Sequence, residues 1–342
     1  MSPFQPLQLP NGQTIANRIA KAAMEENLAD ATQSPSPALI RLYQAWAEGE
    51  TGLLLSGNVM IDRRAMTGPG GVVLEDELHM AQFREWAAVG RAKGAHFWVQ
   101  LNHPGRQTMA NLGQQAWAPS AVSMDLGSFS KMFAEPRAMD DSDIAEVIQR
   151  FATSAALAEQ AGFTGVQIHA AHGYLLSQFL SPLTNRRTDR WGGSLENRAR
   201  LLLVVIGAVR EAVSPQFCVS VKLNSADFQR GGFEADDARQ VIAIRRRPVV
   251  PAAPLRLADR AERRVVVCAG LGGPGLDGGP VHRVHRERLR DRVERVAAPA
   301  ILLAVVDLRR HDRRRARRRH ADLGGEPREV QVHLVPGDAA RR

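Results

Sequence analysis

Short apolar segments alternate with longer stretches of helical periodicity through the first 240 residues of the chain. Four of the apolar segments have the length of buried strands. They lie at residues 51–60, 95–102, 163–169 and 217–223, and a fifth ends near residues 21–24. The longer stretches repeat apolar residues every three to four positions, which indicates helices. They lie at residues 37–49, 79–94, 140–162 and 194–213, with a further one from about Asp236. Strands separated by helices predict a parallel sheet in an α/β fold.

Capping residues predict where some of these helices begin and end. The stretch at 140–162 has Asp141 or Ser142 at its start, and either side chain can accept hydrogen bonds from the first free backbone amides. Gly162 is expected to end that helix, because glycine readily adopts the left-handed conformation of a C-terminal cap. Ser194 is expected to begin the last of the four helices.

Polar side chains share one face of the predicted strands. Lys222 lies on the face of its strand opposite the apolar residues. Gln100, Gln167 and His169 lie on the corresponding face of their own strands, each near the carboxyl end. A parallel sheet covered by helices on both faces would be apolar on both. A β/α barrel, with helices outside and a mouth at the carboxyl ends of its strands, explains the pattern better. A buried lysine needs an anionic or strongly polar partner, so a structural Lys–Glu pair is the alternative to a functional role for Lys222.

The composition of the chain changes abruptly after residue 240. Residues 1–240 hold 21 Lys and Arg against 24 Asp and Glu, whereas residues 241–342 hold 24 Arg against 12 Asp and Glu. The later region has no Ser, Thr, Asn, Lys or Met, although natural domains of this length use hydroxyl and aromatic residues. We therefore divide the chain into residues 1–243, expected to form the barrel part, and residues 244–342, an Arg-rich tail.

Two origins of this tail stay open. The residue types that it keeps are mostly those with GC-rich codons, which favours a frameshift near Ile244, and the alternative is a genuine disordered basic tail. The run RRHDRRRARRRH at 309–320 could bind RNA electrostatically. It has no aromatic residues for base stacking, so we do not expect nucleic-acid binding. The glycine-rich run at 269–280 does not lie between a clear strand and a helix, which argues against a phosphate-binding loop.

Cysteine content and hydropathy exclude several protein classes. Cys218 and Cys268 are too few for a disulfide framework, an iron–sulfur motif or a cysteine-based zinc site, and no metal site is expected. The N-terminus lacks a charged segment followed by an apolar core, and no apolar run approaches the ~18 residues of a membrane helix. The expected location is a reducing cytoplasm, with no membrane partner.

Several motifs, in order and at matching spacing, resemble the Old Yellow Enzyme family of FMN-dependent NAD(P)H oxidoreductases. The longest motif is FTGVQIHAAHGYLLSQFLSPLTNRRTDRWGGSLENRARLL, which starts at residue 163. The other motifs are NRIAKAAM at 17–24, SGNVMID at 56–62, WVQLNHPGRQ at 98–107, WAPSAV at 117–122 and VKLNSADFQRGGF at 221–233. The resemblance covers about residues 3–243 and implies a TIM (β/α)8 barrel. Five of its strands are recognisable, whereas strands six to eight, and the glycine motifs by which relatives hold the cofactor phosphate, are not recognisable in residues 244–342.

The resemblance also implies an FMN site. Four residues would line the flavin through backbone and small side chains: Ala22, Ala23, Met24 and Gly57. Gln100 would hydrogen-bond the pyrimidine end of the ring, and Lys222 would stabilise negative charge on the reduced ring. The chain departs from the family pattern at Glu25, where many relatives have Thr or Cys.

Three residues match the catalytic set of the family: His169, His172 and Tyr174. The histidines would donate hydrogen bonds to a substrate carbonyl oxygen and so make the conjugated β-carbon electrophilic. The phenol of Tyr174, with an ordinary pKa of about 10, would give a proton to the α-carbon.

The implied reaction passes hydride from NADH or NADPH through FMN to the activated C=C bond of an α,β-unsaturated carbonyl compound, the small-molecule partner. Two alternatives remain: an inactive, misframed family member and, less favoured, a nucleic-acid-binding protein that uses the basic tail. The sequence does not fix the oligomeric state, and a homo-oligomer stays open.

Overall fold

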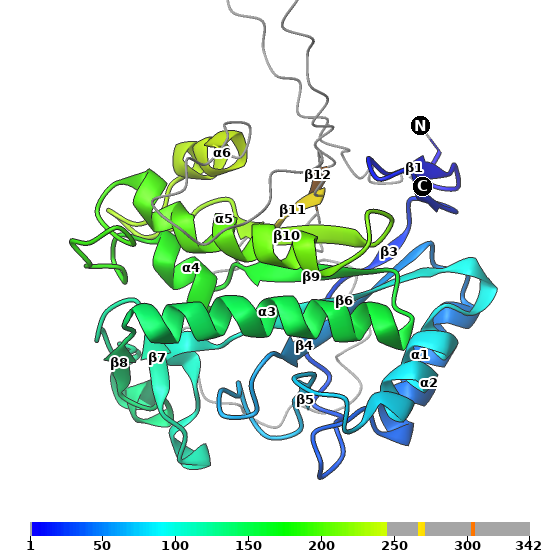
Figure 1. The fold of residues 1–342 in the computed structure, drawn as a ribbon, viewed down its shortest axis with the longest axis horizontal. Helices are drawn as coiled ribbons and strands as arrows, with labels where there is room; N and C mark the ends of the chain where they lie inside the picture. Colours follow the sequence, from blue (N-terminus) through cyan, green and yellow to red (C-terminus); the bar gives the residue numbers. More distant parts are fainter. Residues whose placement is uncertain (1, 245–265, 271–301, 305–342) are drawn as a thin grey trace, which may run out of the picture.

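The computed structural model describes residues 2–244, 266–270 and 302–304. One sheet crosses the centre of this part of the chain (Figure 1). Its strands are β3 (Ala20–Lys21), β4 (Leu53–Met60), β5 (Val72–Val73), β6 (His96–Asn102), β9 (Gly165–Ala170), β10 (Cys218–Asn224), β11 (Val266–Gly270) and β12 (Leu302–Ala304). The strand order is β12-β11-β10-β9-β6-β4-β3, with β5 paired to β4. All neighbouring pairs are parallel except β11 with β12.

Two short pairs of strands lie outside this sheet. The antiparallel pair is β1 (Leu7–Gln8) with β2 (Thr14–Ile15), and the parallel pair is β7 (Ala116–Ala118) with β8 (Pro136–Ala138). The first pair lies near the amino ends of the central strands, and the second lies at the opposite end of the molecule (Figure 1).

The helices follow the predicted alternation with the strands. They are α1 (Pro37–Glu48), α2 (Met80–Gly90), α3 (Asp141–Ala161), α4 (Leu175–Leu180), α5 (Leu195–Ala212) and α6 (Ala235–Ile244). Short 3₁₀ turns occupy Ala92–Gly94, Gly105–Gln107, Ala110–Leu112 and Gly127–Met132. Helices α1, α2, α3 and α5 lie side by side along one face of the sheet (Figure 1). The part of the barrel described here is therefore an open, curved sheet with its helices outside.

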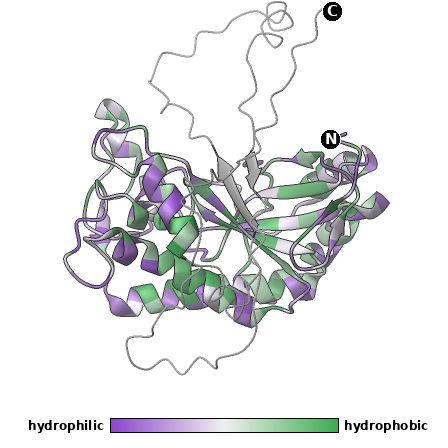
Figure 2. Cartoon of the chain, turned by 90° about the horizontal axis from the view of Figure 1, so that it is seen from above, coloured by the Kyte–Doolittle hydropathy of each residue, from purple (hydrophilic) through white to green (hydrophobic). Residues whose placement is uncertain are grey.

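The two faces of the strands bury different sets of residues. Phe97, Val99 and Val166 pack outward into the large core shared with the helices. Trp98 and Cys218 point to the other side and form a separate small core that also contains Leu53 and Leu55 and is closed by Leu9 and Ile15 of the β1–β2 segment. Figure 2 shows the apolar residues concentrated on the central strands and polar residues on the outer turns. The predicted alternation between an outward and an inward face is confirmed.

The structure corrects the predicted start of α3. Asp140 is its N-cap: the carboxylate accepts hydrogen bonds from the backbone amides of Ser142 and Asp143, and the Asp143 side chain accepts from the Asp140 amide in return. Asp141 and Ser142 instead lie in the first turn, because the reciprocal pair needs a carboxylate three residues after the cap. The other end of α3 was predicted correctly, since Gly162 is left-handed with φ 95°. Ser194 caps α5 as predicted, and its side chain accepts from the amide of Asn197.

The elements missed in the sequence include a strand of the central sheet and a buried helix. Strand β11 lies after residue 243 and continues the parallel sheet, with Lys222 of β10 in register with Cys268. Its apolar run was hidden among arginines. Helix α4 was missed because all six of its residues are buried, which removes the amphipathic pattern. Strand β12 pairs antiparallel to β11 and so departs from the barrel pattern. The division at residue 243 stays a prediction. The basic run at 309–320 lies outside the described residues, as does most of the glycine-rich run at 269–280, and the frameshift stays a hypothesis.

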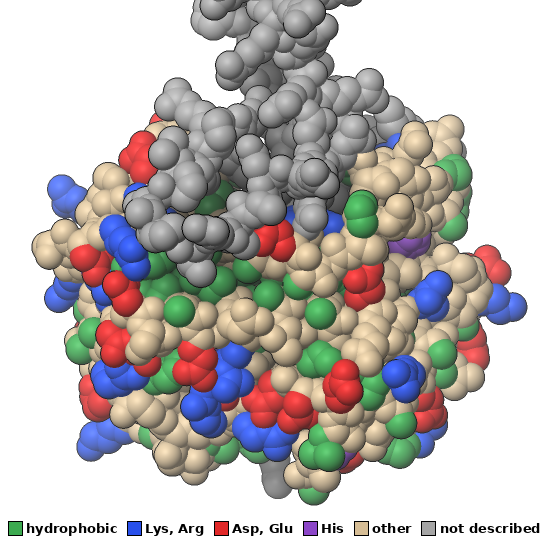
Figure 3. Space-filling model, in the orientation of Figure 1, with side chains coloured by type: hydrophobic (Ala, Val, Ile, Leu, Met, Phe, Trp, Pro, Cys, Tyr) green, Lys and Arg blue, Asp and Glu red, His purple; other side chains and the backbone are tan. Residues whose placement is uncertain are grey.

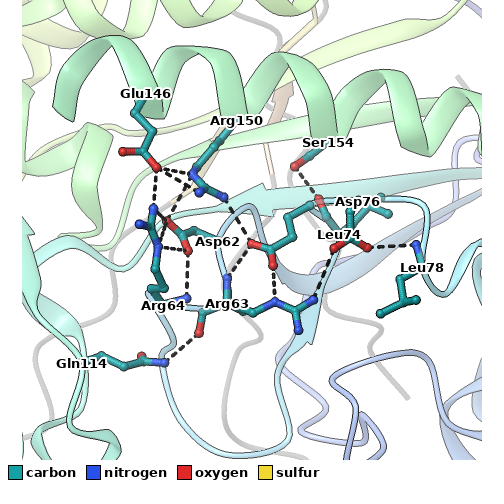
Figure 4. A network of polar contacts seen from close by, with 11 residues as sticks. Asp62, Arg63, Arg64, Leu74, Asp76, Leu78, Gln114, Glu146, Arg150 and Ser154 are labelled. Carbon is teal, nitrogen blue, oxygen red and sulfur yellow. Dashed lines mark hydrogen bonds and ion pairs between the residues drawn. The ribbon is translucent and has the colours of Figure 1, made fainter. Parts of the chain in front are cut away.

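A network of ion pairs holds the segment after β4 against α3 (Figure 4). Arg150 of α3 contacts Asp62 at 3.3 Å, Glu75 at 3.2 Å and Glu146 at 2.9 Å, and Arg64 contacts Asp62 at 2.7 Å. Burial of Asp62 on its own would raise the pKa of the carboxyl group. Hydrogen bonds from Arg64, with the charges of Arg150 and Arg64, have a larger combined effect in the opposite direction, so the net shift of the pKa is downward. The network therefore fixes the chain where it leaves the carboxyl end of β4.

The described surface mixes both signs of charge. Figure 3 shows Lys and Arg side chains interspersed with Asp and Glu over the helices of the visible face, which agrees with the near balance of charge in residues 1–240. Among the helices of the described residues, none combines the length and the hydropathy that crossing a membrane would require.

Candidate functional site

Polar side chains meet at the carboxyl ends of neighbouring strands. Gln100 of β6 is in register with Gln167 of β9, and its Nε2 donates to the Gln167 Oε1 at 2.7 Å. One step further along, His169 of β9 is in register with Lys222 of β10. Gln100, Gln167 and His169 are all buried, and Lys222 is half-buried. The four polar residues predicted to share a face therefore do so, and this face opens at the mouth.

The turn after β9 brings three proton-handling side chains together. The ring of His169 lies near the rings of His172 and Tyr174. The centroid distances are 5.0 and 4.9 Å, and the ring planes are nearly perpendicular. His172 adopts a left-handed backbone with φ 58°, which is uncommon for a residue with a Cβ. Strain of this kind persists only where surrounding contacts hold it, and it is concentrated at functional sites.

Hydrogen bonds from three other segments hold this turn. The Gln107 Nε2 donates to the His172 carbonyl at 2.8 Å, and the His172 amide donates to the Asn224 Oδ1 at 3.0 Å. The Gln178 Nε2 donates to the Gly173 carbonyl at 2.6 Å. These contacts come from the segment after β6, the end of β10 and helix α4, so the turn is fixed from three directions.

The backbone also sets the tautomer of His169. Its Nδ1 accepts a hydrogen bond from the Ala171 amide at 3.2 Å. A nitrogen that accepts from an N–H carries no proton itself, so the proton of the neutral ring resides on Nε2. His169 is therefore a hydrogen-bond donor through Nε2.

The surroundings of the three side chains set their protonation states. Burial, with smaller contributions from His172 and Lys222, holds the pKa of His169 well below 6.5. Surrounding protein atoms and then Lys222 lower the pKa of His172 to about 4, although part of the residue is exposed at the mouth. Burial and then the Glu25 charge raise the pKa of Tyr174 to about 12. At neutral pH the trio is two neutral imidazoles and a protonated phenol.

The segment after β3 packs tightly against β4. Ala22 and Ala23 are half-buried, and Met24 is 52 % exposed. A Cβ added at Gly57 would overlap the Met24 carbonyl oxygen and the Glu26 carboxylate, and it would lie 3.0 Å from the Glu25 Cα. Gly57 is thus a close-approach position, and it brings the predicted flavin-lining residues of two segments into contact.

Glu25 and Asn58 complete the mouth on this side. Asn58 of β4 is in register with Gln100, and its Nδ2 lies 3.4 Å from the Tyr174 hydroxyl. Glu25 is exposed and accepts a hydrogen bond from the Thr67 hydroxyl. The Glu25 charge acts on Tyr174, as the raised pKa of the phenol shows. Asn58, Gln107 and Asn224 were missed in the sequence, and only their proximity in space gives them a place in the site.

His103, which follows β6, is a second buried histidine of interest. Its ring stacks on Trp117 at a centroid distance of 6.0 Å, and its Nδ1 accepts from the Gly105 amide at 3.1 Å. Burial, reinforced by Arg150 and Arg64 and opposed by Asp62, lowers its pKa to about 4. The folded protein therefore holds His103 neutral where an unfolded chain would protonate it.

Acid is expected to destabilise the fold through this group. The unfolded state binds the proton near pH 6.5 and the folded state only near pH 4, so the stabilisation is complete above pH 6.5 and is lost as the pH falls to 4. One such group contributes a slope of at most about 1.4 kcal/mol per pH unit. Urea unfolding between pH 7 and 4 measures the slope, and His103→Gln should reduce it. An unchanged slope in the variant would contradict this assignment.

The described residues hold no group of three or more His, Cys, Asp or Glu side chains placed to bind a metal ion. In this part of the chain, the titratable side chains at the mouth have amide side chains and small residues as neighbours. The arrangement can donate hydrogen bonds to an oxygen and give one proton from a phenol.

Comparison with known proteins shows which sequences this chain resembles. The profile of the NADH:flavin oxidoreductase / NADH oxidase family matches residues 2–250. The chain is 37 % identical over 252 residues to the NADH-dependent flavin oxidoreductase iliE of Hypocrea jecorina, covering 69 % of this chain and 63 % of that protein. It is 36 % identical over 228 residues to an NADPH dehydrogenase of Halalkalibacterium halodurans, covering 66 % of this chain and 64 % of that protein. The chain thus matches less than two thirds of the length of either relative.

The fold agrees with the same family. The structure of the Old Yellow Enzyme homologue from Zymomonas mobilis matches with a TM-score of 0.64 and 27 % identity, covering 72 % of this chain and 69 % of that one. This likeness identifies the curved parallel sheet as part of a TIM barrel, as the motifs predicted. The chain therefore belongs to the NADH:flavin oxidoreductase / NADH oxidase family.

Proposed function

We propose that this protein binds FMN at the mouth described above and uses NADH or NADPH to reduce the activated C=C bond of an α,β-unsaturated carbonyl compound. The observation that carries the proposal is the trio at the end of β9. The ring of His169, which carries its proton on Nε2, lies with its centroid 4.9 Å from that of the protonated phenol of Tyr174. An oxygen that accepts from the imidazoles would hold a conjugated carbon chain beside the phenol.

The residues around the mouth fit a flavin. Gly57 and the Ala22–Met24 segment would offer backbone and small side chains to a flat ring, and the absence of a Cβ at Gly57 lets the two segments pack directly against each other. The Gln100 side chain, whose Nε2 is taken by Gln167, keeps an amide oxygen that can accept from the pyrimidine end of the ring. Lys222, in register with His169, would supply positive charge where reduction adds negative charge.

The histidines would act on the carbonyl oxygen. Two neutral imidazoles are hydrogen-bond donors that carry no net charge, and their donors strengthen as negative charge builds on the oxygen. The fixed turn keeps this geometry in place before the substrate arrives. FMN, when bound, supplies the hydride, which adds to the β-carbon and is replaced from NADH or NADPH.

Tyr174 would complete the reduction. Its O–H bond breaks as the proton is transferred to the α-carbon, and solvent restores the proton to the phenolate afterwards. The Asn58 amide, 3.4 Å from the hydroxyl, can stabilise the phenolate between these events. The net change is addition of a hydride and a proton across one C=C bond.

The proposal is tested with the purified full chain and added FMN. Retention of FMN after gel filtration, loss of its visible absorbance on anaerobic addition of NADH or NADPH, and recovery of the absorbance on addition of 2-cyclohexenone are the expected results. Absence of any FMN affinity would overturn the cofactor assignment. Reoxidation by oxygen but not by the enone would keep an NAD(P)H oxidase activity and overturn the ene-reductase assignment.

A further inference from the structure

A buried ion pair joins the two ends of the loop that carries the proposed flavin-lining residues. Lys21, the last residue of β3, contacts Glu26 with an Nζ–Oε1 distance of 2.9 Å. The side chains are only 8 % and 11 % exposed. Between them lie the four residues 22–25, which we call the flavin-facing loop. The ion pair therefore closes this loop at its base.

Tyr43 of α1 completes the contact. Its hydroxyl donates to the Glu26 Oε1 at 2.6 Å and accepts from the Lys21 Nζ at 2.9 Å. The third proton of the Lys21 ammonium goes to the Leu55 carbonyl at 2.9 Å. The ammonium also lies over the rings of Tyr43 and Trp46, at 4.7 and 4.3 Å from their centroids. All three donors of Lys21 are thus used in one closed network.

The same network reaches the strand opposite the loop. The Gly57 amide donates to the Tyr43 hydroxyl at 3.2 Å, and the Leu55 carbonyl accepts from Lys21. Gly57 lies between Leu55 and Asn58, where the register of β4 with β6 shifts. An irregular strand leaves backbone groups free of the ladder, and here the Tyr43 hydroxyl accepts the hydrogen bond of the Gly57 amide. The loop and Gly57 are therefore held by one set of hydrogen bonds.

Stability alone gives no reason for such a network. Removing two charges from water costs more than burying apolar side chains of similar volume, so an apolar pair would serve a purely structural role at least as well. The charged network does fix geometry, because each hydrogen bond holds one backbone group or side chain at a defined position relative to another.

We propose that Lys21, Glu26 and Tyr43 form a positioning clamp that sets the flavin-facing loop and Gly57 at the spacing required by the flavin ring. In this proposal the three residues act through the backbone that they hold. The proposal rests on the proposed function, since it assigns the clamp to the FMN site.

Three variants separate positioning from stability. Lys21→Met and Glu26→Gln each leave one buried group without its partner, so both should lower the thermal midpoint. The double variant K21M/E26Q removes both members and should regain most of the lost midpoint. Its dissociation constant for FMN should nevertheless stay raised about tenfold or more, because the loop is no longer held. A shift of the visible spectrum of the bound FMN should accompany the weaker binding.

Amide hydrogen exchange of residues 22–25 in the FMN-free protein gives a second measurement, and faster exchange is expected in the double variant. The matched control is R137M/D143N, which removes the 2.7 Å ion pair at the start of α3. It should lower the midpoint and leave FMN affinity unchanged. If a charge variant does not fold, Tyr43→Phe, which removes one hydroxyl, should still weaken FMN binding several-fold.

A double variant that binds FMN and protects residues 22–25 as the parent does would overturn the clamp. Failure of the proposed function has a different signature, since the unmodified chain would then bind no FMN. In that case hydrogen exchange alone decides whether the network holds the loop.

Discussion

Replacing Tyr174 with Phe is expected to lower the rate constant of enone reduction by about 10²- to 10⁴-fold, the usual contribution of a positioned general acid. The variant keeps the ring that packs 4.9 Å from His169 and removes only the O–H group. With its pKa raised to about 12, the Tyr174 phenol is protonated throughout the range in which the enzyme would work, so the loss measures proton donation. The measurement is single-turnover oxidation of reduced FMN by 2-cyclohexenone.

The reductive half of the cycle provides the internal control. Hydride transfer from NADH or NADPH to FMN needs no proton from Tyr174, so its rate should not change in the variant. The FMN dissociation constant should also stay the same. A Tyr174→Phe protein that reduces the enone as fast as the parent would remove the phenol from the mechanism.

The trio at the end of β9 could be predicted from sequence because its members are local. His169, His172 and Tyr174 lie within six residues, directly after an apolar strand, and the family motif fixes their order. Strand alternation also placed Gln100, Gln167 and Lys222 on the inward face, and the register confirms it. Alternation predicts the inward residues because successive side chains of a strand point to opposite faces of the sheet, and residues in register on neighbouring strands share a face.

The residues that hold the trio could not be predicted in this way. Asn58, Gln107 and Asn224 are ordinary polar residues in the sequence, each on a different segment. Their contacts depend on which strand ends meet at the mouth and on the left-handed turn at His172. No local pattern encodes either property.

The clamp was missed for a related reason. Lys21 lies in the family motif NRIAKAAM at the end of an apolar segment, and no local pattern marks Glu26 and Tyr43 as its partners. Burial of Lys21 and Glu26 is evident only when α1 covers them. Glu25 departs from the family pattern in the sequence. In the structure it lies exposed, accepts a hydrogen bond from the Thr67 hydroxyl and contributes to the raised pKa of Tyr174.

Gly57→Ala is the second substitution from which we expect a large effect. The new Cβ would overlap the Met24 carbonyl and the Glu26 carboxylate, and neither can retreat easily, because one is backbone and the other is tied to Lys21 and Tyr43. Overpacking of this kind costs about 1–3 kcal/mol of folding free energy. The displaced loop should also raise the FMN dissociation constant about tenfold or more, because a binding site needs its lining groups held within about 0.5 Å of the productive geometry.

Gly207→Ala is the matched control. Gly207 lies exposed in α5 with nothing within 4 Å of an added Cβ, so alanine there should stabilise the helix by about 1 kcal/mol and leave FMN binding unchanged. Urea unfolding and FMN fluorescence titration measure both effects on both variants. If Gly57→Ala matched Gly207→Ala in stability and in FMN affinity, the loop would not be in close contact with β4. Both the flavin-facing surface and its clamp would then have to be abandoned, because each depends on that contact.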